Sequence, residues 1–185
     1  MGFYNQDEEP VQAGADVAET DTVVTADVSV DGKIYSLTMQ ALRQVMSRGL
    51  TNATAATLTV TAADHAGQVI TFNRAGGIAT TLPAATGSGN KYRFIVGTTF
   101  TSSATIKVVG NDTMVGHAIL LQDSADTAVA FEAGGTDDTV TMNGTTTGGL
   151  AGMEVELIDI ATDLWFVKVI GGATGTEATP FSATV

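Results

Sequence analysis

Cysteine is absent from this sequence of 185 residues. A disulfide framework, a Cys-ligated zinc site, an iron–sulfur cluster and a thiol nucleophile are therefore excluded. The sequence also lacks any run near the ~20 apolar residues that span a bilayer. Its first residues, MGFYNQDEEP, have neither the basic region nor the apolar region of a signal peptide. We expect a soluble chain without a secretion signal, stabilised by packing and sheet pairing.

Basic residues are scarce: 8 Lys and Arg stand against 20 Asp and Glu, which gives a net charge of −12. A surface this negative repels nucleic-acid phosphates and anionic lipid headgroups, so we expect neither nucleic acid nor membrane as a partner. Eight of the acidic residues precede the first basic residue, Lys33. This pattern is typical of a solvated, mobile arm, and it also fits an acidic arm that docks on a basic partner.

Residues for nucleophilic or metal chemistry are few. The two histidines, His65 and His117, have no metal-ligand spacing, and no Gly-x-Ser-x-Gly elbow occurs. The Gly-Ser-Gly sequence at 87–89 does not match a phosphate-binding loop, because Asn90 separates it from Lys91 and a strand pattern follows instead of a helix. We predict that the protein is not an enzyme and has no catalytic residues, metal site or cofactor.

Carboxylates and the single tryptophan also have ordinary structural interpretations. Asp123 and Asp126 flank a turn, where an aspartate usually bonds nearby backbone. Glu154 and Glu156 share one face of a predicted strand, which we expect to be solvated. Trp165 lies in DLWFVKVIGG, where alternation groups it with two valines in a core-facing row. The alternative for Trp165 is a platform that stacks on a sugar.

The N-terminal part of the chain is predicted to be an extended arm followed by a hairpin. Residues 1–21 are too polar and acidic to pack alone. The segments TVVTADVSV (22–30) and KIYSLT (33–38) alternate as strands around the turn signal Asp31-Gly32.

A short α-helix is predicted over residues 37–48, LTMQALRQVMSR, with Gly49 after its last turn. Its apolar stripe packs either on the chain's own sheet or on a neighbouring subunit. Arm, hairpin and helix form one predicted region, residues 1–50, and a β-sandwich domain follows over residues 51–185.

From residue 53 onward, short strand patterns alternate with turn clusters at a spacing of roughly 8–12 residues. Because no helical segments carry parallel crossovers, we predict antiparallel pairing. Thr61 and Asp64 form a capping box that predicts one helical turn within residues 61–67. The predicted fold class is all-β: an antiparallel, jelly-roll-like β-sandwich preceded by the arm and the helix.

The segments 58–99 and 137–172 together resemble the capsid decoration, or cement, proteins of tailed bacteriophages. The resemblance rests on the order of structural motifs: Thr61 to Asp64 with Gly67, Leu82-Pro83-Ala84, Tyr92 with Phe94, and the strand of Trp165. It implies a non-enzymatic β-sandwich on the outer capsid surface of a virion, without a cofactor. The implied partners are the major capsid protein and further copies of the chain, commonly as a homotrimer.

Interface candidates follow from position and side-chain type, although each residue also fits internal packing. They comprise two aromatic residues of the arm, the stripe and two arginines of the helix, and one aromatic near the C-terminus: Phe3, Tyr4, Met39, Leu42, Arg43, Val45, Met46, Arg48 and Phe181. Pro180 favours an extended tail that could pair with a neighbouring sheet edge. The alternative function is a carbohydrate-binding or receptor-binding module of a phage tail fibre or spike. A β-sandwich hydrolase is a third hypothesis.

Overall fold

The structure is a computed structural model that describes residues 22–25, 35–38, 49–124 and 126–183. The chain divides into two units, residues 1–47 and residues 48–185. The described part is mostly β, which confirms the predicted all-β class.

The first unit contains a two-stranded antiparallel sheet of β1 (Thr22–Thr25) and β2 (Tyr35–Thr38). The pairing of these two segments was predicted, but its register was not. A turn at Asp31-Gly32 would place Val30 opposite Lys33, whereas the structure pairs Thr25 with Tyr35.

The start of the predicted helix is also corrected. Leu37 belongs to β2 and pairs with Val23 of β1, because Leu37 continues the alternating strand pattern that begins at Tyr35. The rest of that predicted helix, residues 39–48, lies outside the described residues, as does the predicted arm, residues 1–21.

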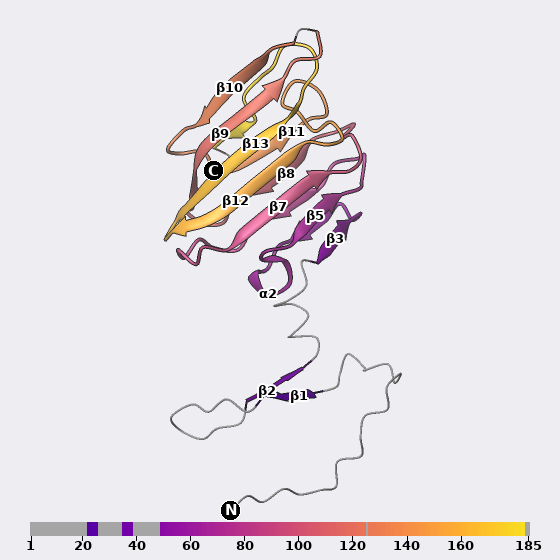
Figure 1. The fold of residues 1–185 in the computed structure, drawn as a ribbon. Helices are drawn as coiled ribbons and strands as arrows, with labels where there is room; N and C mark the ends of the chain where they lie inside the picture. Colours follow the sequence, from indigo (N-terminus) through magenta and orange to yellow (C-terminus); the bar gives the residue numbers. More distant parts are fainter. Residues whose placement is uncertain (1–21, 26–34, 39–48, 125, 184–185) are drawn as a thin grey trace, which may run out of the picture. The chain divides into compact units, whose positions relative to one another are not determined.

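The second unit contains two sheets and one short helix. The seven-stranded sheet has the order β10-β9-β13-β12-β7-β5-β3, and the five-stranded sheet has the order β14-β11-β8-β6-β4. Figure 1 shows the seven strands side by side, with β8 and β11 behind them. In chain order the elements are β3 (Leu50–Ala53), β4 (Thr57–Thr59), α2 (Ala62–His65), β5 (Val69–Phe72), β6 (Ala79–Thr81), β7 (Lys91–Val96), β8 (Ala104–Lys107), β9 (Thr113–Leu121), β10 (Ala128–Ala133), β11 (Thr139–Met142), β12 (Glu154–Ala161), β13 (Leu164–Gly172) and β14 (Phe181–Ser182).

Both sheets are mixed, so the prediction of purely antiparallel pairing was wrong. Strands β3, β5 and β7 run parallel in one sheet, and β4, β6 and β8 run parallel in the other. From β3 to β8 the chain alternates between the two sheets. Each strand of one sheet therefore belongs to the crossover between two parallel strands of the other, and no long helix is needed.

The later strands combine both kinds of pairing. β9 with β10 and β12 with β13 are antiparallel neighbours in the chain, and β12 also pairs antiparallel with β7. A parallel pairing of β9 with β13 joins these strands into one continuous sheet.

The buried faces of both sheets contribute to one hydrophobic cluster. On β13, Trp165, Val167 and Val169 are fully buried, which confirms the core-facing row predicted from their alternation. The Trp165 ring packs against Tyr92 of β7, with 5.7 Å between ring centroids.

The predicted helical turn is α2, with Thr61 as its N-cap; of the predicted capping box only the bond from the Asp64 N–H to Thr61 is formed. Thr61 Oγ1 accepts a hydrogen bond from the Asp64 backbone N–H at 3.2 Å and lies 2.7 Å from the Asp64 carboxylate, to which it donates. His65 Nδ1 accepts the Thr61 N–H at 3.1 Å. His65 therefore caps its own turn, in agreement with a structural role for this histidine.

Candidate interaction surface

The outer face of the seven-stranded sheet carries side chains that alternate with those of the buried core. A charged row crosses five neighbouring strands of this face in register. It runs from β10 to β7 through Glu132, His117, Lys168, Glu156 and Arg93. We call these residues the charged row.

Apolar side chains lie on both sides of the charged row. On one side, Val115, Phe166 and Ile158 are neighbours in register, and each is half-buried. On the other side, Ile119 and Ile170 are neighbours, and Ile170 is 40% exposed. These two sets are the apolar rows. On β9 and β13 they lie on either side of the charged row, whereas on β12 the residue in register with Ile170 is Glu154.

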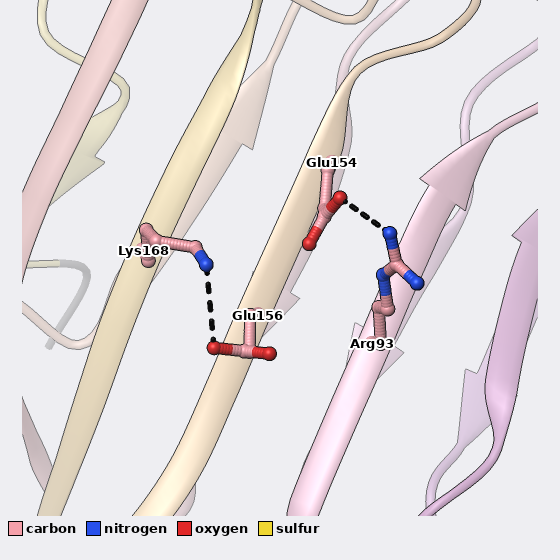
Figure 2. A network of polar contacts seen from close by, with 4 residues as sticks. All are labelled: Arg93, Glu154, Glu156 and Lys168. Atoms are coloured by element: carbon pink, nitrogen blue, oxygen red, sulfur yellow. Dashed lines mark hydrogen bonds and ion pairs between the residues drawn. The ribbon is translucent and has the colours of Figure 1, made fainter.

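Two ion pairs order the middle of this face (Figure 2). Arg93 Nη2 donates to Glu154 Oε2 at 2.8 Å, and Lys168 Nζ lies 3.5 Å from Glu156 Oε1. The hydrogen bond from Arg93 holds the pKa of Glu154 below its usual value. Glu154 and Glu156 share one face of β12, as predicted, and bridge to different neighbouring strands.

A cavity of about 310 Å³ lies at the β7 end of the charged row. It is lined by Gly67, Gln68, Val69, Lys91, Arg93 and Glu156. Lys91 is exposed and forms no ion pair within the described residues, whereas Arg93 forms an ion pair with Glu154. The cavity therefore presents two cationic groups, one of them unneutralised, on a chain whose net charge is −12.

The Gly-Ser-Gly loop binds a carboxylate of the chain itself. Asp159 of β12 is 3% exposed, and it accepts six hydrogen bonds from the backbone N–H and hydroxyl groups of Thr86 and Ser88 and from the Gly87 N–H. Burial alone would raise the pKa of Asp159, but these hydrogen bonds outweigh it and lower the pKa to about 2. The loop amides that could have faced a phosphate are thus bonded to Asp159.

A second buried carboxylate fixes the tryptophan. Asp112, 4% exposed, accepts the Ala85 N–H at 2.7 Å and the Trp165 Nε1–H at 3.2 Å. Because Trp165 is fully buried, the alternative interpretation of this residue as a sugar-stacking platform was wrong. The buried positions of Asp112 and Asp159 were missed by the sequence interpretation.

Of the nine predicted interface residues, the structure describes one, Phe181. Phe3, Tyr4, Met39, Leu42, Arg43, Val45, Met46 and Arg48 all lie outside the described residues. Phe181 is corrected: it is 5% exposed in the hydrophobic core, because β14 pairs with β11 of the same chain. Its ring therefore packs internally, and the extended C-terminal segment already has a partner strand within the fold.

No group of three or more potential metal ligands occurs among the described side chains. Within the same residues, no helix has the length and apolarity to cross a membrane. Comparison with known proteins finds no matching family model, no similar curated protein and no similar solved structure.

Proposed function

We propose that the protein is a non-enzymatic virion protein of a tailed bacteriophage that binds the outer surface of the capsid shell and stabilises it. Its fold in this proposal is a two-sheet β-sandwich, and its partner is the major capsid protein. The proposal also includes self-association, as a homotrimer, which the sequence resemblance implies.

The observation that carries the proposal is the striped outer face of the seven-stranded sheet. Ile170 of the apolar rows and the nearby Leu121 are 40% and 51% exposed on this face, and the other members of the apolar rows are half-buried. Protein interfaces combine such apolar area with polar groups that set orientation, and the charged row supplies those groups. An extended, ordered face of this kind suits distributed contacts with a large, flat partner.

The polar groups in the interior also favour a structural role. Asp159 and Asp112 accept hydrogen bonds from loop backbone and from an indole, so both carboxylates hold elements of the fold together. Neither carboxylate is exposed in a cleft where it could act on a substrate. We therefore interpret both as contributions to stability.

The test is binding to shells assembled from the major capsid protein, measured by co-sedimentation. Ile170→Glu places a second carboxylate beside Glu154 and should weaken binding at least tenfold, because burying an unpaired charge at an interface is costly. The matched control is Thr81→Glu, an exposed strand residue of the five-stranded sheet, which should bind as wild type does. Failure of the wild-type protein to sediment with shells would overturn the proposal. Equal loss in both variants would overturn the assignment of the face.

A further inference from the structure

We infer that the cavity beside the charged row is a binding site for an extended acidic peptide, whose carboxylates pair with Lys91 and Arg93. This inference goes beyond the proposed function and does not depend on it. The site is the cavity of about 310 Å³ between the start of β5 and the outer face of β7.

The charges at the cavity favour a carboxylate ligand. Glu156 is paired with Lys168 and Glu154 with Arg93, which leaves the Lys91 ammonium as the charge of the cavity lining without an ion pair among the described residues. Arg93 donates to Glu154 through Nη2, and a guanidinium has further N–H donors available for a second acceptor. Gln68 adds an amide donor to the lining. A ligand carboxylate would thus meet one free cation and one partly used cation.

The spacing of the two cations matches an extended peptide. Lys91 and Arg93 are two residues apart on one face of β7, so their Cα atoms are roughly 7 Å apart at 3.3–3.4 Å per residue. Acidic side chains at alternate positions of an extended peptide share one face with the same separation. One peptide could therefore place successive carboxylates at Lys91 and Arg93.

The size of the cavity favours a peptide over a single small anion. A volume of about 310 Å³ is at the lower end of the roughly 300–1,000 Å³ of typical ligand sites, and one phosphate or acetate ion would not fill such a site. Val69 adds an apolar wall, and Leu50, its register neighbour on β3, is 67% exposed. Apolar residues of the peptide can pack there while the carboxylates bind the cations.

The experiment measures binding of a blocked, fluorescent six-residue peptide with Glu at alternate positions and Ala between them, using the full chain. The control peptide has Gln in place of Glu. We expect saturable binding of the Glu peptide that is at least tenfold tighter than that of the Gln peptide. Lys91→Glu should weaken it at least tenfold. The matched charge reversal Lys107→Glu, on the exposed end of β8 in the other sheet, should leave it unchanged.

The inference is overturned by no saturable binding of the Glu peptide, by equal binding of both peptides, or by equal effects of the two charge reversals. Inorganic phosphate is the competitor that separates the ligand classes. If phosphate displaced the peptide at a phosphate concentration no higher than that of the peptide, the cavity would be a site for a small anion. This result would overturn the inference that its ligand is a peptide. Far-UV circular dichroism of each variant checks that the fold is retained. Shell binding tested with Ile170→Glu is a separate result, so either conclusion can fail alone.

Discussion

Acidic side chains occupy two contrasting places in this protein. Asp159 and Asp112 are buried at 3% and 4% exposure, and their bonds come from loop N–H groups, loop hydroxyls and an indole. Glu154 and Glu156 lie on the outer face and bond to the long side chains of Arg93 and Lys168. The two buried carboxylates hold loop backbone and an indole in place, whereas the two outer carboxylates hold long side chains on the sheet surface.

The difference follows from the cost of removing a charge from water. A buried carboxylate is tolerated only when its oxygens are hydrogen-bonded, so its partners must be preorganised and are expensive to remove. An exposed carboxylate keeps water as an alternative partner, and its ion pair contributes little to stability. The contrast predicts a graded series of effects on unfolding, from the buried acid to the outer ion pairs.

The largest effect is expected from Asp159→Ala. This change removes six hydrogen bonds that hold the loop of Thr86 to Ser88 against β12. We expect the free energy of unfolding in urea at pH 7 to fall by about 2–3 kcal/mol, the usual scale for losing a buried charged network. Asp159→Asn keeps one acceptor oxygen but turns an NH2 group towards the loop N–H donors, so it should also lose stability. If Asp159→Ala lowered the free energy of unfolding no more than a typical surface substitution does, the contrast between buried and exposed carboxylates would be contradicted.

The same carboxylate predicts a dependence of stability on pH. The pKa of Asp159 is lowered from 3.8 to about 2 in the folded chain, so its contribution is fully present above about pH 4. As the pH falls from about 4 towards 2, the carboxyl group is protonated in the unfolded chain but still ionised in the folded chain. Proton binding therefore favours the unfolded state over this range, and the contribution of Asp159 to stability is lost. The stability difference between wild type and Asp159→Asn should therefore narrow over this range. Urea unfolding at pH 2 to 6 measures it, and a constant difference would contradict the expectation.

A smaller effect is expected from Trp165→Phe. The substitution removes the Nε1–H that Asp112 accepts and leaves a small void, while Asp112 keeps the Ala85 N–H. We expect a loss of about 1–2 kcal/mol in the free energy of unfolding. Val167→Ala, on the same buried face of β13, is the control for loss of volume without loss of a hydrogen bond. In a double-mutant cycle, Trp165→Phe and Asp112→Ala should be non-additive, and full additivity would show that the two side chains are not coupled.

Local chemistry in the sequence was sufficient to predict several parts of the fold. The bond of the Asp64 N–H to Thr61 lies within one turn, and the burial of Trp165 follows from strand alternation. The parallel pairing could not be predicted in this way, because alternation does not tell which of two sheets a strand joins. The connection between two parallel strands of one sheet passes through a strand of the other sheet. Parallel pairing therefore needs no helix, and the absence of helices did not imply antiparallel order.

The candidate surface was predicted only in part. The common face of Glu154 and Glu156 follows from their spacing, but their cations lie on β7 and β13, and only the register brings them together. The role of Asp159 depends on loop residues more than 70 positions away in the sequence. A local signal did exist, since Asp159 has the same parity as the buried Val155 and Leu157 on β12.

The smallest effect is expected at the outer ion pair of Arg93 and Glu154. Both side chains retain contact with water, at 50% and 25% exposure, so salt screens their attraction and solvent replaces a lost partner. Arg93→Ala should leave the midpoint of urea unfolding within experimental error at 0.15 M salt, a condition at which the Debye length is about 8 Å. A double-mutant cycle with Glu154→Ala should show a coupling that decreases further as the salt concentration rises. A coupling as large as that of Trp165 with Asp112, or one that salt does not change, would show that the outer pair is effectively buried and would remove the distinction between the two places.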